Sequence, residues 1–112
     1  MQRVEAIIRP ERLEPVKLAL EAIGFNGLNV THVTGRGVQR GVIHGARGEE
    51  MRIDMLPKIR VEVVVKDSDV DKVIDAVIAA ARTGSIGDGK IFVSAVTQAI
   101  RVRTGERGDD AI

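Results

Sequence analysis

A glycine-rich stretch from Ala81 to Val93, ARTGSIGDGKIFV, carries the residues best suited to binding an anion. Gly84 is followed, after four residues, by Gly89 and Lys90, which is most of the spacing of a phosphate-binding Walker A loop. In such a loop the glycines let backbone N–H groups converge on phosphate, and the lysine adds a positive charge. The stretch therefore predicts a site for a nucleotide or another anion.

Two features separate this stretch from a P-loop that hydrolyses a nucleotide. Ile91 stands where a Walker A loop has the Ser or Thr that binds Mg²⁺. The stretch also follows a predicted helix that ends near Arg82 and leads into a predicted strand, which reverses the order of a P-loop. We therefore expect anion binding without P-loop chemistry. A helix end and turn with no ligand is the alternative.

Arg101 and Arg103 form a second basic feature. They are two residues apart at the end of an alternating run, KIFVSAVTQAIRV, which predicts a strand over residues 90–102. On a strand they would project to the same side and could hold phosphate oxygens with their planar guanidinium groups. Solvated surface arginines without a ligand are the alternative.

Residues that could catalyse a reaction are few. His32 lies in an alternating strand pattern and His44 in a glycine-rich segment, and neither has an evident partner in the sequence. An acidic group of Glu49, Glu50 and Asp54 is better explained as solvated loop residues. Because the sequence has no His-Glu-x-x-His motif, no cysteine and no visible Ser-His-Asp arrangement, it favours holding a nucleotide over turning it over.

The composition limits the partners of such a site. The chain has 112 residues, 44% of them hydrophobic, which predicts one domain, residues 1–112, with a modest core. The formal charge is +1, and Phe25 and Phe92 are the only aromatic residues, so neither overall charge nor a stacking platform favours nucleic acid. Without cysteine, a signal-peptide pattern or an apolar run of about 20 residues, we expect a cytoplasmic protein that does not insert into membranes.

An internal repeat indicates the elements that position these residues. The tripeptide Arg-Val-Glu at Arg3 recurs at Arg60. Each copy begins with the alternating apolar pattern of a strand and continues with apolar residues at helical spacing. A further alternating run follows each helix, at residues 27–35 and 90–102. Four strands with two helices on one face make the ferredoxin-like βαββαβ arrangement, an α+β fold.

Two parts of this predicted fold have no partner in the chain. The sheet face without helices would expose Ile7 and Val64 beside Glu5 and Glu62, which favours self-association, although scattered apolar surface residues are the alternative. The glycine-rich segment of about residues 36–54 shows no sustained periodicity, which predicts a long mobile binding loop. A hairpin that extends the second and third strands is the other interpretation of that segment.

The stretch ARTGSIGDGKIFV and the C-terminal stretch IRVRTGERGDDAI together resemble the paired signatures of the PII signal-transduction proteins. The segments LPKIRVEVVV at residues 56–65 and VEAIIRPERL near the start agree with them, and the likeness covers essentially the whole chain. PII proteins are homotrimers of ferredoxin-like subunits. They sense ATP, ADP and 2-oxoglutarate in clefts between subunits and signal nitrogen and carbon status by docking a long loop, the T-loop, on target proteins.

The resemblance implies a binding site for each effector. Gln39 would bind Mg²⁺, which chelates 2-oxoglutarate, and Lys58 would pair with a carboxylate of that acid. Because phosphates and a dicarboxylate repel one another, such a site needs Mg²⁺ and several cations. The positions that the resemblance assigns to ATP or ADP, with the two arginines coming from a neighbouring subunit, are Ile7, Asn29, Gly37, Val38, Gln39, Glu62, Val64, Gly87, Asp88, Gly89, Lys90, Arg101 and Arg103.

The predicted T-loop departs from the family pattern. Family members controlled by nucleotidylation carry a tyrosine at the loop tip, where this chain has Met51, so we expect no modification of that kind. Glu49 and Glu50 stand where some relatives offer a serine for phosphorylation. Arg47 matches the arginine that relatives insert into an ammonium channel, which keeps that channel as an expected partner. The C-terminal loop is expected at about residues 102–112.

Three further departures fall in or near the predicted nucleotide site. Val38 replaces an arginine that touches phosphate, Arg36 replaces a phenylalanine, and Asn29 replaces a common threonine, which leaves the preference between ATP and ADP open. The sequence thus predicts a non-enzymatic regulator that homotrimerises and responds to ATP or ADP, Mg²⁺ and 2-oxoglutarate. The alternatives are a paralogue that senses a different small anion and a weak ATPase or phosphotransferase that uses the same site.

Overall fold

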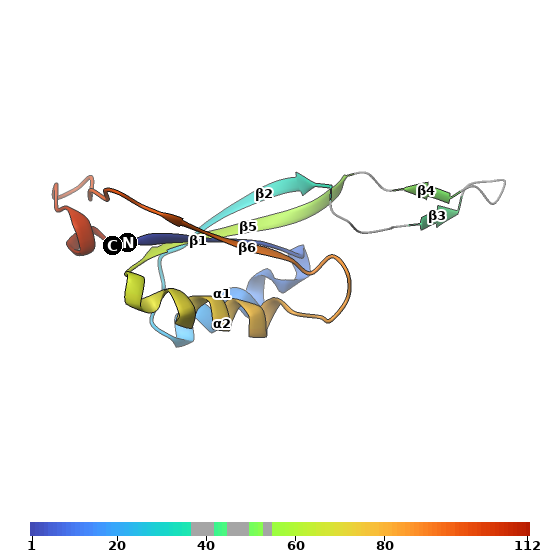
Figure 1. Ribbon diagram of the computed structural model, residues 1–112, viewed down its shortest axis with the longest axis horizontal. Helices are drawn as coiled ribbons and strands as arrows, with labels where there is room; N and C mark the ends of the chain where they lie inside the picture. The colour runs from blue at the N-terminus through green and yellow to red at the C-terminus, as the bar shows by residue number, and fades with distance from the viewer. Residues whose placement is uncertain (37–41, 45–49, 53–54) are drawn as a thin grey trace.

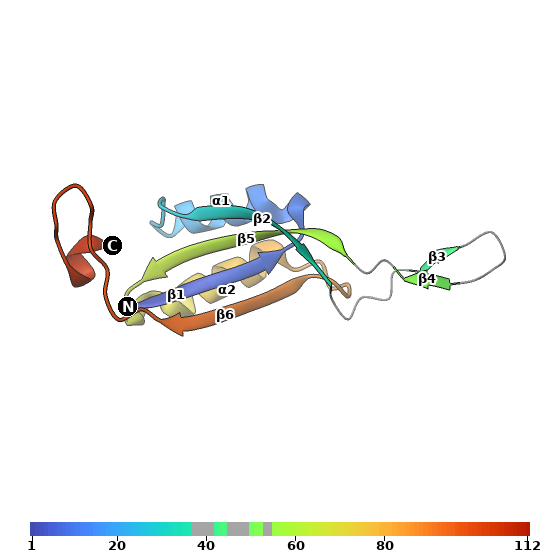
Figure 2. The same ribbon diagram turned by 90° about the horizontal axis from the view of Figure 1, so that it is seen from above.

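The computed structural model describes residues 1–36, 42–44, 50–52 and 55–112. One antiparallel sheet contains β1 (Gln2–Ile8), β2 (Asn29–Gly35), β5 (Leu56–Val65) and β6 (Gly89–Ala95), in the order β2-β5-β1-β6. Helices α1 (Leu13–Ala22) and α2 (Val70–Ala81) lie side by side on one face of this sheet, as Figures 1 and 2 show. This strand order and the one-sided helices confirm the predicted ferredoxin-like α+β fold.

The alternation along the strands decides which residues form the core. Because successive side chains of a strand point to opposite faces, β1 and β5 each bury one set of side chains under the helices. Among the described residues no polar or charged residue is buried. The core consists of Val4, Ala6, Ile8, Val16, Leu20, Ile59, Val61, Val63, Val65, Val70, Val73, Val77 and Ala81.

Each helix follows a strand through a short 3-10 helix. η1 (Pro10–Arg12) precedes α1, and η2 (Asp67–Asp69) precedes α2, so the repeat in the sequence corresponds to two strand-helix units. Pro10 opens η1 and Pro15 lies in the first turn of α1, where a missing N–H removes no helical hydrogen bond. In the described part of the chain, no helix is long and apolar enough to span a membrane.

The last strand is shorter than the sequence predicts. β6 ends at Ala95 instead of residue 102, and the Val96 N–H makes one further bond to the Met1 carbonyl (3.1 Å). The chain then reverses in a turn at which Gly105, with a φ of 73°, donates its N–H to the Arg101 carbonyl (2.7 Å). The prediction that Arg101 and Arg103 share one side of a strand was therefore wrong, because both belong to this reversal and not to the sheet.

The segment predicted as a long loop is described only in part. Two short strands within it, β3 (Val42–His44) and β4 (Glu50–Arg52), pair with each other in an antiparallel ladder and not with the main sheet. These segments form a ladder of their own, so the long loop and the hairpin that extends the second and third strands both stay predictions. Other predicted site and partner residues of the segment lie outside the described residues, namely Gly37, Val38, Gln39 and Arg47.

Candidate anion-binding site

The turn between α2 and β6, residues 82–88, contains most of the glycine-rich stretch (Figure 1). Gly84, Gly87 and Gly89 have φ values of 89°, 101° and 107°, which lie in the left-handed region that favours glycine. Gly89 is restricted further, because a Cβ atom there would lie 1.7 Å from the Ile7 carbonyl oxygen. The path of the backbone therefore accounts for these glycines before any ligand is considered.

The carboxylate of Asp88 organises this turn. Its Oδ2 atom accepts hydrogen bonds from the backbone N–H groups of Thr83 (2.8 Å) and Gly84 (2.9 Å), and its Oδ1 atom accepts from the Thr83 hydroxyl and from Arg9 Nε (3.0 Å). The Thr83 hydroxyl bond above all, with the other bonds, holds the pKa of Asp88 well below its usual value. Since this negatively charged side chain is directed into its own turn, Asp88 can contact a phosphate only through its backbone.

Two arginines that follow β1 bind different parts of this region, Arg9 the turn itself and Arg12 the end of α2. Arg9 donates from Nη2 to the Ile86 carbonyl (2.8 Å), in addition to its ion pair with Asp88. Arg12 donates from Nε (2.9 Å) and Nη2 (2.5 Å) to the carbonyl of Ala80, in the last turn of α2, where helix carbonyls lack an N–H partner from their own helix. Neither contact could be predicted from the sequence, because no local pattern connects Arg9 with Asp88, 79 positions away, or Arg12 with Ala80, 68 positions away.

Lys58 reaches the same turn from β5. Its Nζ atom donates a hydrogen bond of 2.6 Å to the Gly87 carbonyl. Burial first, and then the nearby Arg9 guanidinium, lower the pKa of the Lys58 ammonium group. The structure thus brings together two of the predicted site residues that are 29 positions apart in the sequence.

Lys90 lies at the start of β6, on the sheet face without helices. The strand register places it opposite Ile7 of β1, which in turn lies opposite Arg60 of β5. Lys90 is exposed, and within the described ranges no hydrogen bond or ion pair engages its ammonium group. This lysine is therefore available to an anion placed next to the turn.

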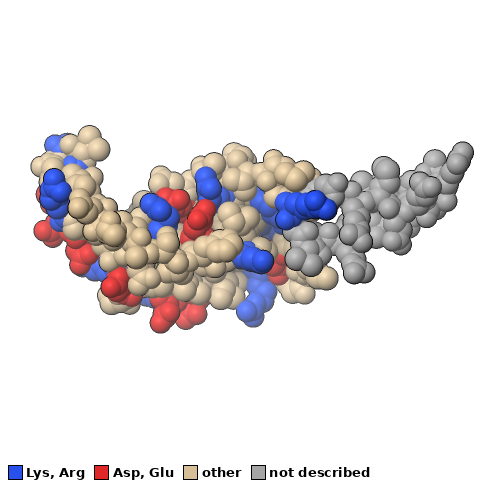
Figure 3. Space-filling model, turned by 45° about the horizontal axis from the view of Figure 1, so that its top comes forward, with Lys and Arg blue, Asp and Glu red and all other residues tan. Residues whose placement is uncertain are grey.

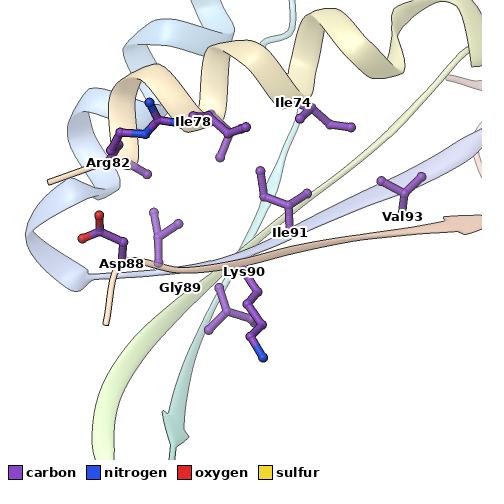
Figure 4. Close-up of a pocket in the computed structure, with 12 residues that line it drawn as sticks. Ile74, Ile78, Arg82, Asp88, Gly89, Lys90, Ile91 and Val93 are labelled. Carbon is purple, nitrogen blue, oxygen red and sulfur yellow. The ribbon is translucent and has the colours of Figure 1, made fainter. Parts of the chain in front are cut away.

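An apolar cavity of about 370 Å³ lies on the other side of β6, between this edge strand and α2. Figure 4 shows Ile74 and Ile78 of α2 facing Ile91 and Val93 of β6 across the cavity, whereas Lys90 points away on the opposite side of the strand. The walls continue the hydrophobic core at the edge of the sheet. The cavity is thus separate from the face on which the Lys90 ammonium group lies.

The residues assigned to adenine lie on the sheet face without helices. Ile7, Glu62 and Val64 are all half-buried there, but the register places Ile7 opposite Arg60, so four positions along β5 separate it from Val64. Asn29 of the edge strand β2 lies opposite Glu62. One chain therefore presents these residues along a strip of the face and not as a closed pocket.

Four charged residues occupy the middle of the same face. Glu5 and Glu62 lie directly opposite each other on β1 and β5, an arrangement of like charges that is unfavourable by itself. Diagonal ion pairs offset it, from Arg3 to Glu62 (3.2 Å) and from Arg60 to Glu5 (3.4 Å). Figure 3 shows acidic and basic atoms close together over the middle of the molecule and more basic atoms toward the grey residues.

The C-terminal arginines are remote from the turn within one chain. The seven residues of β6 lead from the turn to the C-terminal segment, so roughly 20 Å of strand separates the two. Figures 1 and 2 show the turn and the C-terminal segment at opposite ends of the sheet. Arg101 forms an ion pair with Glu106 (3.1 Å), and Arg103 is exposed. A single chain therefore does not unite these arginines with Lys90.

Candidate metal ligands are scarce in the described residues. They contain no group of three or more His, Cys, Asp or Glu side chains that could hold a metal ion. His32 lies exposed on β2, and His44 lies in β3. The predicted ligand Gln39 is outside the described ranges.

The family model for nitrogen regulatory protein P-II matches residues 1–106. This chain belongs to the P-II family. Over its whole length, the P-II chain is 54% identical to nitrogen regulatory protein P-II 2 of Methanothermobacter thermautotrophicus, of which it covers 97%. It is 52% identical to nitrogen regulatory protein P-II of Microchaete diplosiphon, and both chains are covered completely.

A solved structure supports the same assignment. The crystal structure of Arabidopsis thaliana PII bound to citrate is similar to this P-II chain, with a TM-score of 0.81 and 44% sequence identity. The similarity covers 98% of this chain and 87% of that one. The resemblance found in the sequence is thereby confirmed. P-II family proteins are signalling proteins that regulate nitrogen-metabolism targets.

Proposed function

We propose that this P-II protein is a non-enzymatic regulator that binds ATP or ADP at the turn of residues 82–88. The arrangement around Gly87 carries this proposal: Arg9, Lys58 and Asp88 fix the turn, and the Lys90 ammonium group lies unengaged on the adjoining strand. A turn that is already ordered loses little conformational entropy when it binds an anion. The positive charge of Lys90 then favours the phosphates.

The proposed nucleotide site needs more than one subunit. Arg101 and Arg103 lie at the far end of their own chain, so a neighbouring subunit of a homotrimer would supply them. The sheet face with Ile7 and Val64 would supply the apolar wall against which adenine packs. Its four central charges compensate one another in ion pairs, which makes the face suitable for burial against another copy.

We propose 2-oxoglutarate and Mg²⁺ as further effectors. Lys58 brings an ammonium group to the turn, where it can pair with a carboxylate. The related Arabidopsis thaliana PII structure was obtained with citrate, which is also a polycarboxylate. When bound, Mg²⁺ would neutralise phosphate and carboxylate oxygens. Because Mg²⁺ is commonly held by few protein ligands together with substrate phosphates, a site with Gln39 as its protein ligand fits the absence of an acidic cluster in the described residues.

The segment of about residues 36–54 would carry the signal to the target protein. It joins β2 to β5 and therefore leaves the sheet beside Lys58. We propose that Arg47 contacts an ammonium channel and that the protein works in the cytoplasm. Since Met51 replaces the tyrosine of nucleotidylated relatives, switching would depend on effectors alone.

Calorimetric titration of the purified protein tests this function. MgATP and MgADP should each bind with saturable heat, and 2-oxoglutarate should bind only when MgATP is present. No heat from 2-oxoglutarate, together with heat from another small anion, would support the paralogue alternative. Phosphate release that continues over many turnovers would support the ATPase alternative and contradict a non-enzymatic regulator.

A further inference from the structure

We infer that Arg9 is a positioning residue for the anion-binding turn, acting on the backbone around Gly87 without contacting the ligand. This inference rests on the proposed nucleotide site at residues 82–88. Arg9 fixes the orientation of the Ile86–Gly87 peptide group. The affinity for a nucleotide would then depend on a side chain that belongs to neither the glycine turn nor β6.

The guanidinium group of Arg9 joins two points of the turn. Nε lies 3.0 Å from Asp88 Oδ1, and Nη2 lies 2.8 Å from the Ile86 carbonyl oxygen. The donors of a guanidinium group form a rigid planar fork, so both contacts together fix the distance and angle between these acceptors. The side chain is only 19% exposed, which protects the ion pair from full competition with water.

Arg9 and Lys58 hold consecutive peptide groups. Arg9 binds the carbonyl of Ile86, and Lys58 binds the carbonyl of Gly87. The chain contains no cis peptide bond among the described residues, so each following N–H points away from the bound carbonyl. Glycine permits rotation of both peptide groups, because it has no Cβ atom. Without Arg9, the Ile86–Gly87 peptide could turn its carbonyl toward an anion and repel it.

Arg12 provides a matched comparison within the same 3-10 segment. It also makes two hydrogen bonds from its guanidinium group, but both go to the Ala80 carbonyl at the end of α2. This contact supports the helix end and leaves the peptide groups around Gly87 unaffected. Removal of the Arg12 side chain should therefore lower the unfolding temperature, whereas removal of the Arg9 side chain should lower the affinity for MgATP.

The test compares Arg9→Gln, Arg9→Lys and Arg12→Gln with the wild type, using calorimetric titration with MgATP and thermal unfolding. Arg9→Gln should weaken MgATP binding about tenfold, since it removes a charge-assisted bond. Arg9→Lys keeps the charge but not the fork, so it should weaken binding less. Arg12→Gln should lower the unfolding temperature and change the dissociation constant by less than about threefold.

Several results would overturn the inference. One is binding of MgATP to Arg9→Gln within about twofold of the wild type. Another is a loss of MgATP affinity that is proportional to the decrease in unfolding temperature, with the same proportion in Arg9→Gln and in Arg12→Gln. If Arg9→Gln does not fold, Arg9→Lys replaces it, and binding equal to the wild type would overturn the inference.

Amide resonances separate this inference from the proposed function. If the wild-type protein does not bind MgATP, the nucleotide proposal fails. The effect of Arg9 on the backbone around Gly87 is then tested with NMR spectra of the ligand-free protein. Arg9→Gln should then shift or broaden the Gly87 and Asp88 amide signals, while Arg12→Gln should leave them in place. Unchanged signals in Arg9→Gln would overturn the positioning role.

Discussion

The Nζ atom of Lys58 lies 2.6 Å from the carbonyl oxygen of Gly87, so a side chain from β5 binds the turn that leads into β6. The ammonium group already has an acceptor before any ligand arrives. A carboxylate that binds Lys58 must therefore share or replace the Gly87 carbonyl. This relationship links the proposed 2-oxoglutarate site directly to the backbone of the proposed nucleotide site.

Replacement of Lys58 should separate the two effectors. In Lys58→Met we expect no binding of 2-oxoglutarate, because the cation that pairs with its carboxylate is missing. MgATP binding should persist with an affinity reduced by less than about tenfold, since Arg9 and Asp88 still hold the turn. Calorimetric titration with each effector measures both effects. Lys66→Met, which alters an exposed lysine just after β5, is the control and should bind both effectors normally.

Acid should weaken the turn through Asp88. Its pKa in the folded protein lies below the ordinary value of 3.8, so the ionised carboxylate stabilises the folded state. This contribution is fully present above that ordinary value and is lost as the pH falls below it toward the folded-state pKa. The free energy of unfolding of the wild type should thus exceed that of Asp88→Asn at neutral pH. The difference should shrink once the pH drops below 3.8, and a difference that is constant in acid would contradict the role of this carboxylate.

Alanine at Gly89 should be far more damaging than alanine at Gly84. Both glycines have positive φ values, but only at Gly89 would a Cβ atom overlap the Ile7 carbonyl oxygen. We expect Gly84→Ala to cost about 1–2 kcal/mol for the left-handed backbone alone. Gly89→Ala should cost about 3 kcal/mol or more, because β1 and β6 must also separate. Urea unfolding of both variants measures the difference, and equal costs would show that the close approach to Ile7 is unimportant.

Mixed subunits should reveal whether two chains share one nucleotide site. Lys90→Ala and the double variant Arg101→Ala with Arg103→Ala should each bind MgATP poorly. When the two variants are co-expressed, mixed assemblies should contain some sites that combine an intact Lys90 with intact arginines. Titration should then show a fraction of sites with wild-type affinity.

The outcome of mixing is decisive in both directions. Assemblies of the double variant with itself serve as the control, and they should show no high-affinity sites. If the mixed sample also shows none, although mass spectrometry detects mixed assemblies, the arginines and Lys90 do not act across a subunit boundary. Wild-type affinity for MgATP in the double variant by itself would show that Arg101 and Arg103 do not contribute to the site.

The sequence predicts the sheet well, because the alternation of apolar and polar residues that indicates a strand is a local pattern. Alternation in residues 3–8 and 60–65 reports a buried and an exposed face, and helical spacing follows each strand. The same signal misled the prediction at the last strand, where alternation continues past Ala95 although the chain has left the sheet. Alternation describes side-chain types, and it does not report whether a neighbouring strand is present to pair with.

The contacts that hold the candidate site were harder to predict. Gly84, Gly89 and Lys90 could be singled out from glycine spacing and charge, and the family resemblance added Gly87 and Lys58. The contact of Arg9 with the turn and that of Arg12 with the end of α2 are tertiary contacts, which no local pattern encodes. Thr83 offered one usable signal, since a hydroxyl five residues before an aspartate across a glycine turn suits a side-chain hydrogen bond.

The close fit of Gly89 against Ile7 also fixes the alignment of an entire edge strand. Sliding β6 by one residue would bring Lys90 under α2 and turn Ile91 outward, so a charge would enter the core while an apolar group met water. Insertions between Gly89 and Ile91 should accordingly be rejected during evolution, whereas length changes at the exposed tip near Ser85 would leave the strand in place. The glycine turn of this chain thus also sets the register of β6 against β1.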